Sequence, residues 1–210
     1  MQSTQFDRIL RRIATILSVV ILSLCLIYVS TGILLSFYYE PTAGGAYNSL
    51  RMIDTEVAYG WLFHRAHDIA GNTMIAIALM QIVVMFLGRQ FRRSWLFAWV
   101  SCILFTLSAI GLDWTAMILD WTQEGYWRFN IELGNIQAIP VIGTQLRDIL
   151  TGGGAISSIT VEHLYTLHSY IISLAAITLA VLHFAALMWQ ERQMYAEGQT
   201  QLAGTSLAES

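Results

Sequence analysis

The sequence predicts an all-α membrane protein that forms a transmembrane four-helix bundle. Two observations support this prediction. Of the 210 residues, 56% are hydrophobic and only 12% are charged, which is more apolar than an ordinary soluble domain. Four segments are also long enough to cross a hydrocarbon core, which needs roughly 20 apolar residues. They cover residues 14–39, 60–87, 95–119 and 164–189. The first is too long for a signal peptide and has no small-residue cleavage site, so we assign it to the bundle.

The charged residues predict the orientation of the bundle. Arginines gather before the first span and in the short second connection, as Arg8, Arg11, Arg12, Arg89, Arg92 and Arg93. The other two connections carry the acids Glu40, Asp54, Glu56, Asp120, Glu124, Glu132 and Asp148. By the positive-inside rule, both termini face the cytoplasm and the two acidic connections lie on the opposite, positive side. The net charge of −3 gives no reason to expect a nucleic-acid partner.

The segments outside the spans are expected to form short helices and a tail. Residues 7–14 (DRILRRIA) are amphipathic and are expected to lie on the cytoplasmic surface before the first span. The connection after the third span contains two further helical stretches, 121–133 and 144–154, the second ended by three glycines. Residues 1–192 therefore form one membrane domain, and the polar segment 193–210 is expected to be disordered. Cys25 and Cys102 lie inside spans and are expected to serve as small packing residues.

All five histidines lie in the second and fourth spans or at their entrances. His67 and His168 are each one to two turns inside the positive-side end of antiparallel helices, so they have matching depth. Two facing helices that each offer one imidazole at one depth provide what a haem with two axial histidines requires. His64 and His163, nearer the surface, are expected to be ordinary interfacial side chains.

A second level lies deeper in the membrane. His183 follows His168 by fifteen residues, which is about 22 Å along a helix at 1.5 Å per residue. On the second span the matching position, fourteen residues after His67, is Gln81. The spacing therefore predicts a ligand pair at the first level and, at the second, a ligand position without its histidine.

Several stretches are distinctive when they are taken together. They are STGILLSFYYEPT, TEVAYGWLFHRAH, QEGYW, AIPVIG, and LYTLHSY followed by LHF, and they fall within residues 10–190. In this combination the chain resembles the cytochrome b family, most of all the short cytochrome b6 form. The resemblance implies two stacked b-type haems between the second and fourth spans, with electrons supplied by a quinol oxidised on the positive side.

The resemblance also implies roles for individual residues. His67, His168 and His183 are expected to bind iron. Gly32 corresponds to one of the glycines that let helices approach the porphyrin. Arg65 is expected to pair with a haem propionate. The quinol site is expected around Gly125, Tyr126 and Ile139.

The second level departs from the family pattern, because Gln81 stands where the family has a histidine. Three interpretations remain open: a high-spin haem held by His183 alone, a haem that Gln81 approaches as a weak ligand or through water, or no haem, with His183 as an ordinary interhelical hydrogen-bonding residue. The other departures from the family's arginines and glycines are Val84, Met188, Ser18, Cys102 and Ala116.

The expected function is that of a haem b-carrying membrane subunit of a quinol-oxidising complex of the cytochrome bc type, not active alone. The resemblance implies partners: a subunit with the C-terminal cytochrome b half and its PEWY motif, an iron–sulfur or cytochrome c acceptor, membrane lipid, and a homodimeric complex. The alternative is a mono-haem or haem-containing membrane anchor of a quinone-linked dehydrogenase or reductase. A haem-free scaffold would leave the equal-depth histidines unexplained.

Overall fold

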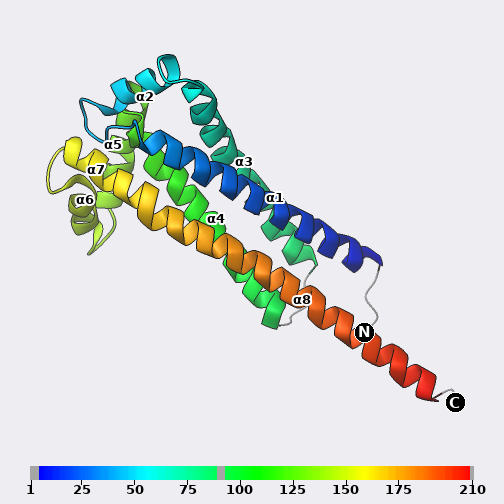
Figure 1. Cartoon of the computed structure of the whole chain (residues 1–210). Helices are drawn as coiled ribbons and strands as arrows, with labels where there is room; N and C mark the ends of the chain where they lie inside the picture. The colour runs from blue at the N-terminus through cyan, green and yellow to red at the C-terminus, as the bar shows by residue number, and fades with distance from the viewer. Residues whose placement is uncertain (1–4, 89–92, 209–210) are drawn as a thin grey trace.

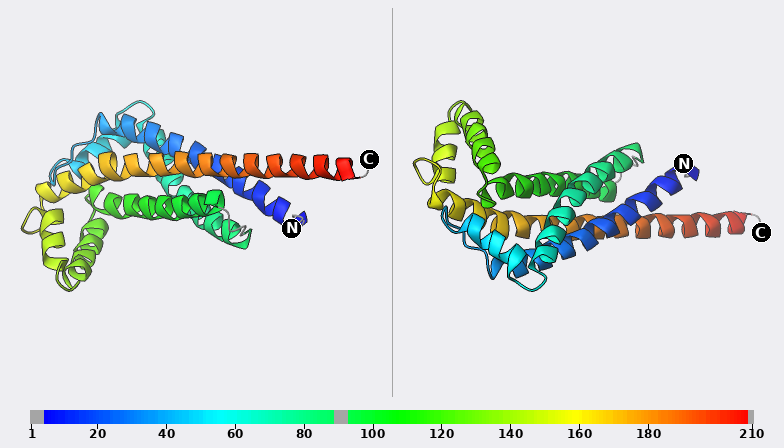
Figure 2. Two further views of the ribbon diagram at one scale, coloured as in Figure 1. Left: turned by 90° about the horizontal axis from the view of Figure 1, so that it is seen from below. Right: turned by 90° about the horizontal axis from the view of Figure 1, so that it is seen from above.

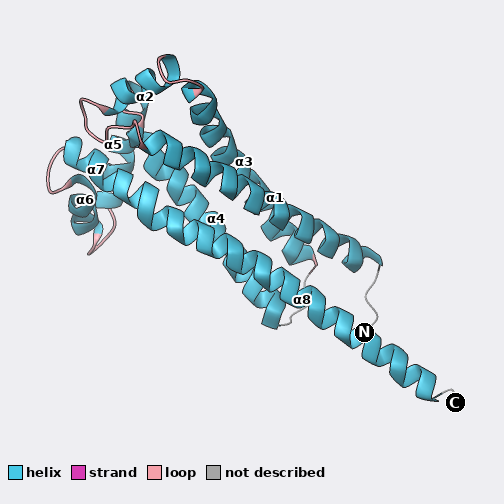
Figure 3. Ribbon diagram, viewed as in Figure 1, coloured by secondary structure: helices cyan, strands magenta, loops and turns pink. Residues whose placement is uncertain are grey.

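Four long helices cross the molecule in the computed structural model, which describes residues 5–88 and 93–208 (Figure 1). They are α1 (Gln5–Ser36), α3 (Gly60–Leu87), α4 (Arg93–Leu119) and a continuous rod made of α7 (Ser158–Thr166), the π-helix η1 (Leu167–Ile172) and α8 (Ser173–Ala208). All four are long and apolar enough to span a membrane. Within the described ranges there are only helices and connecting loops (Figure 3). The predicted all-α, four-span fold is therefore confirmed.

Three short helices join the spans at one end of the bundle. They are α2 (Ala46–Thr55), between α1 and α3, and α5 (Gln123–Gln137) and α6 (Gly143–Thr151), between α4 and α7. Figure 2 shows α5 and α6 side by side beyond the end of α4, turned away from the bundle axis. The two helices expected after the third span are present, whereas α2 was not foreseen.

Local sequence explains where these short helices begin and end. The Thr122 hydroxyl accepts a hydrogen bond from the Gly125 amide and caps the start of α5. Gly152 ends α6 with a φ of 76°, a left-handed conformation that favours glycine. Ser157 and Thr160 form a reciprocal capping box at the start of α7. These caps fix the direction in which the chain re-enters the bundle.

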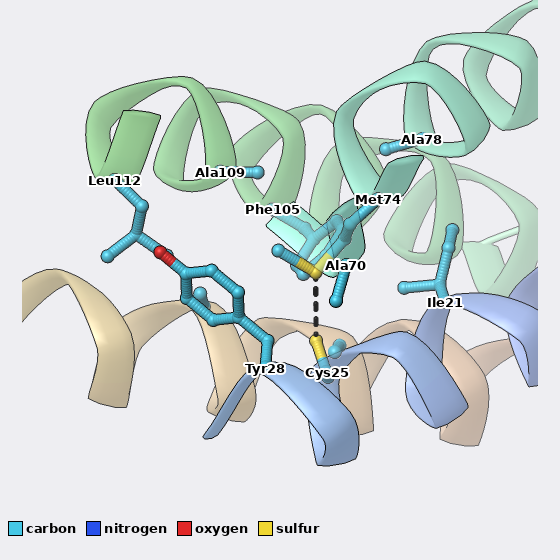
Figure 4. Packing of buried hydrophobic residues seen from close by; sticks show 11 residues of the cluster. Ile21, Cys25, Tyr28, Ala70, Met74, Ala78, Phe105, Ala109 and Leu112 are labelled. Atoms are coloured by element: carbon cyan, nitrogen blue, oxygen red, sulfur yellow. Dashed lines mark hydrogen bonds between the residues drawn. The ribbon is translucent and has the colours of Figure 1, made fainter. Parts of the chain in front are cut away.

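The core consists of three clusters of buried apolar side chains stacked along the bundle. Figure 4 shows the middle cluster, where Cys25 and Tyr28 of α1 face Met74 of α3 and Phe105 of α4. The Cys25 thiol lies 3.4 Å from the Met74 sulfur. Cys102 is fully buried in the cluster nearer the termini. Both thiols are free and packed inside the bundle.

Two terminal segments differ from expectation. Residues 7–14, expected to lie on the membrane surface, are part of the unbroken helix α1, because no proline or glycine interrupts the helix there. The segment after Arg192, expected to be disordered, continues α8 as far as Ala208. It is rich in alanine, glutamine and glutamate and has no proline, so its composition permits helix.

The two termini lie at the same end of the bundle, opposite α2, α5 and α6 (Figure 1). Arg8, Arg11 and Arg12 lie at this end on the first turns of α1, and Arg93 begins α4. Arg89 and Arg92, which contributed to the predicted orientation, lie outside the described residues.

Candidate functional site

The first site is a pair of histidines near the loop end of the bundle. His67 lies on α3 and His168 on η1, and their ring centroids are 6.2 Å apart with an interplanar angle of 52°. His168 is buried and His67 partly buried. The structure therefore brings together the two residues that depth matching had paired.

Each of these imidazoles is anchored by a backbone carbonyl on a neighbouring helix. The Nδ1 atom of His67 lies 2.9 Å from the Tyr28 carbonyl oxygen of α1. The Nδ1 atom of His168 lies 3.0 Å from the Leu112 carbonyl oxygen of α4. A carbonyl only accepts, so Nδ1 carries the proton in both rings and Nε2 keeps its lone pair. A metal-binding histidine usually donates its Nδ1–H in this way, which leaves Nε2 directed at the metal.

Threonine hydroxyls complete these anchors. Thr31 Oγ1 lies 3.2 Å from His67 Nδ1, and Thr115 Oγ1 lies 3.0 Å from His168 Nδ1. Each threonine also donates to a carbonyl of its own helix. Both rings are thus held at Nδ1 by two oxygens, which limits their rotation.

His168 lies on a π-helical turn within the fourth span. Residues 167–172 form this wider turn between α7 and α8, and the Ser173 hydroxyl donates to the His168 carbonyl. Short π-helical segments occur frequently at functional sites. No simple sequence pattern predicts this π-helical turn.

The distance between the rings fits one metal ion held by both. A metal–nitrogen bond is about 2 Å long, and the ring centroid lies about 1 Å behind the nitrogen, so two imidazoles on one metal have centroids about 6 Å apart. The observed distance is 6.2 Å. Gly32 makes room on the α1 side, because a Cβ atom there would lie 3.0 Å from His67 Cε1. In their spacing and in the close approach of α1, His67 and His168 therefore fit a haem held by two histidines.

Tyr28 occupies part of the same space. Its ring stacks on His67 at a centroid distance of 3.9 Å and lies 6.3 Å from His168, which places it beside the line that joins the two imidazoles. Its hydroxyl is 3.2 Å from His168 Nε2. Gly71 faces this ring, since a Cβ there would be 2.9 Å from it. Iron at His168 Nε2 therefore requires the Tyr28 hydroxyl to move away.

A cavity of about 70 Å³ adjoins Tyr28 between α3 and α4. Asp68, Asn72 and Asp113 contribute its polar lining. The Tyr28 ring therefore has an empty space next to it, lined by α1, α3 and α4 and not by α8.

The second site lies deeper and is closed. Gln81 of α3 and His183 of α8 are in direct contact, with their Nε2 atoms 3.0 Å apart. Both side chains are fully buried, at 0% and 1% exposure. Spacing had paired these two positions, and the structure brings them together. The Gln81 Oε1 atom and the Ser18 hydroxyl are buried without a hydrogen-bond partner among the described residues.

The other predicted site residues lie at three separate places in the structure. Arg65 is exposed on α3 and, two positions before His67, does not share its helix face. Gly125 and Tyr126 lie together at the start of α5, by a groove of about 260 Å³ lined by Trp121, Thr122, Gln123, Tyr126 and Trp127. Ile139 follows the far end of α5, about 20 Å along the helix at 1.5 Å per residue. The structure does not bring it beside Tyr126.

The surface histidines bind local partners. His64 Nδ1 lies 2.9 Å from an Asp54 carboxylate oxygen, and its Nε2 lies 4.0 Å from Asp68. His163 Nδ1 lies 2.8 Å from the Ile149 carbonyl oxygen. The interfacial role of His64 and His163 stays a prediction.

Comparison with known proteins identifies the family of this chain. The family described as Cytochrome b/b6/petB matches residues 3–191. The cytochrome b6 of Auxenochlorella protothecoides is 32% identical and that of Oltmannsiellopsis viridis 31% identical, each over 159 residues, which are 76% of this chain and 74% of the relative. The cytochrome b6 of Mastigocladus laminosus is 30% identical over the same length.

A solved structure shares the fold. A chain of the "Hyperthermophilic respiratory Complex III" superimposes with a TM-score of 0.71 at 22% identity, over 84% of this chain. This chain spans just under half, 47%, of that one. A family match over most of the sequence, together with relatives above 30% identity, shows that the chain belongs to the cytochrome b family.

Proposed function

We propose that this chain is the haem b-carrying membrane subunit of a quinol-oxidising electron-transfer complex of the cytochrome bc type. The observation that carries the proposal is the pair His67 and His168, with ring centroids 6.2 Å apart at one depth of a four-helix bundle. The sequence relatives named cytochrome b6 support the same function.

In this proposal His67 and His168 would hold the haem iron through their Nε2 atoms. Haem b supplies a one-electron carrier when it is bound. The carbonyls of Tyr28 and Leu112 keep both Nδ1 atoms protonated and both rings oriented. A haem held by both histidines would be suited to relaying electrons and not to binding oxygen.

The quinol would approach at the start of α5. Gly125 and Tyr126 lie there beside an aromatic groove, at the same end of the bundle as His67 and His168. Gly125 lets α5 pack onto the end of α4, since a Cβ atom there would lie 2.2 Å from the Met117 carbonyl oxygen. Ile139 is not included in this site, because it lies at the other end of α5.

The orientation and the partners also belong to the proposal. The arginines on the first turns of α1 favour a cytoplasmic location for both termini. Quinol gives up two electrons, so its oxidation at the opposite face would need a further one-electron acceptor, for which an iron–sulfur protein or a cytochrome c is suited. A separate subunit would supply the C-terminal cytochrome b half, and the complex would be a homodimer.

The test is haem binding by the purified chain and two histidine variants. The wild-type protein should show a low-spin b-type spectrum, and His67→Ala and His168→Ala should each lose it. His163→Ala is the matched control, because this histidine is five residues before His168 but bonds the Ile149 carbonyl. A low-spin spectrum that survives both ligand substitutions would refute the assignment.

The second candidate is a mono-haem anchor of a quinone-linked dehydrogenase or reductase. The direct contact between Gln81 and His183 favours it, because a transmembrane relay needs a second carrier. Subunits that co-purify with the chain from mild detergent decide between the two. An iron–sulfur protein or a cytochrome c supports the first function, and a flavin-containing subunit supports the second.

A further inference from the structure

The two levels of the bundle share one set of backbone anchors on the α1 and α3 side. His67 is held at Nδ1 by the Tyr28 carbonyl. Fourteen residues later on α3, Gln81 donates from Nε2 to the Ala14 carbonyl at 3.0 Å, and Ala14 is fourteen residues before Tyr28 on the antiparallel α1. Gln81 therefore occupies the position at the deep level that His67 occupies near the loops.

The same correspondence holds on the α4 and α8 side. His168 is held at Nδ1 by the Leu112 carbonyl. Fifteen residues later, His183 is held at Nδ1 by the Ala98 carbonyl at 2.8 Å, and Ala98 is fourteen residues before Leu112 on α4. The deep level thus keeps the two backbone carbonyls that would hold a pair of ligands. It differs in the pair of side chains that those carbonyls hold, which is Gln81 and His183.

The Gln81–His183 pair at the deep level leaves no position for a metal ion. Two metal–nitrogen bonds of about 2 Å on opposite sides of one ion separate the nitrogens by about 4 Å, whereas Gln81 Nε2 and His183 Nε2 are 3.0 Å apart. The amide nitrogen of Gln81, which is the atom that faces His183, has two hydrogens to donate and no lone pair to offer a metal. The Gln81 Oε1 atom has lone pairs and no hydrogen-bond partner among the described residues, but it is not the atom in contact with His183. The amide hydrogens meet the Ala14 carbonyl and the lone pair of His183 Nε2. Both ring nitrogens of His183 are therefore bonded within the protein.

The surrounding helices also close this level. Ser18 of α1, Ala78 of α3 and Cys102 of α4 are each fully buried, at 0% exposure. The Cys102 sulfur lies 3.9 Å from the Ala78 carbonyl. At the other level Gly32 faces the His67 ring and Gly71 faces the Tyr28 ring, and a cavity of about 70 Å³ adjoins Tyr28. The deep level has side chains in contact where a porphyrin would need a slot between helices.

We propose that Gln81 and His183 form an interhelical hydrogen-bond clasp in place of a second haem site, so that the chain carries one haem b, held by His67 and His168. The clasp ties α1, α3, α4 and α8 together through four buried groups: Gln81, His183 and the carbonyls of Ala14 and Ala98. This inference rests on the proposed function at the His67–His168 level. It also implies that this chain's own cofactor serves only the loop-side half of the bundle.

The experiment measures haem per chain in the purified full-length protein by the pyridine haemochrome method, with the low-spin spectrum and the melting temperature. Wild-type protein should contain one haem b per chain. His183→Leu, which replaces the imidazole with an apolar side chain of similar size, should retain one haem and an unchanged spectrum while its melting temperature falls. His168→Leu, the matched substitution at the other level, should lose the haem.

Gln81→Leu is the second deep-level variant and leaves His183 in place, in case His183→Leu does not fold. It should also keep one haem with the wild-type spectrum and melt at a lower temperature. The clasp would be refuted by two haems in the wild-type protein, or by a lower haem content or an altered spectrum in either deep-level variant. None of these results would contradict the proposed function. A wild-type chain without haem would overturn the proposed function and the one-haem inference together.

Discussion

Gly32 gives the sharpest test of the loop-side site, through the substitution Gly32→Ala. The added Cβ would lie 3.0 Å from His67 Cε1 and 3.4 Å from Nδ1, which is closer than ordinary van der Waals contact. His67 cannot easily retreat, because its Nδ1 is bonded to the Tyr28 carbonyl at 2.9 Å. The ring must therefore tilt, strain that bond, or push α1 away from α3.

Two opposing energies set the size of the effect. Alanine favours a helix over glycine by about 0.5–1 kcal/mol, whereas overpacking a well-packed site costs about 1–3 kcal/mol. The net change by this difference is a destabilisation of about 0–2.5 kcal/mol. Tilting a ligand ring affects metal binding as losing the group that holds the ring does, and weakens binding by about 10–100-fold.

The assay compares haem retention and the low-spin spectrum of Gly32→Ala with those of Gly111→Ala. Gly111 lies in the middle of α4, and a Cβ there would meet only Ile172, at 3.7–3.8 Å. The control should bind haem like the wild-type protein and melt at the same temperature or slightly higher. If Gly32→Ala retains haem as well as the control does, the close approach of α1 to His67 has no functional consequence and the argument fails.

Three further results are expected. Gly125→Ala should lower the stability of the protein by about 1–3 kcal/mol, measured by thermal melting, because its Cβ would lie 2.2 Å from a backbone carbonyl of α4; an unchanged melting temperature would contradict this packing. His64→Ala should leave the haem spectrum unchanged and cost less than about 1 kcal/mol, since its partner Asp54 is 41% exposed; loss of haem would show that the histidine acts at the site. In cysteine-labelling experiments on intact membrane vesicles, Asn130→Cys on α5 should react with an impermeant reagent from the positive side only and Thr200→Cys on α8 from the other side; reaction of both from one side would exclude the proposed orientation.

The sequence predicted the paired positions because helix geometry is regular. A residue's depth in a membrane helix follows from counting, at 1.5 Å per residue, so His67 and His168 could be matched, as could Gln81 and His183. The four spans followed from composition in the same way. Both predictions rely on the helix rise per residue and on the apolar composition of each span, which packing against other helices hardly alters.

The groups that hold the ligands could not be read from the sequence. The anchors of His67 and His168 are backbone carbonyls, which every residue carries, so the sequence does not distinguish Tyr28 or Leu112 from its neighbours. The Tyr28 side chain was missed for another reason. An aromatic residue in a membrane span is ordinarily a packing residue, and only its distances of 3.9 Å to His67 and 3.2 Å to His168 reveal its position in the site.

The backbone carbonyls that hold the side chains are equivalent at both levels. The residue type at one α3 position, histidine or glutamine, can therefore decide whether a level binds a cofactor or closes in a direct side-chain contact. An imidazole and a carboxamide can each donate one hydrogen to a carbonyl on α1, as His67 and Gln81 do. The difference lies in what remains: the imidazole presents a lone pair inward, and the amide nitrogen presents a second hydrogen. Once the Tyr28 hydroxyl moves away from His168 Nε2, a lone pair opposite His168 leaves two acceptors for one metal ion. A hydrogen opposite His183 instead satisfies that histidine directly. The same backbone frame can therefore hold a metal at one level and close without one at the other.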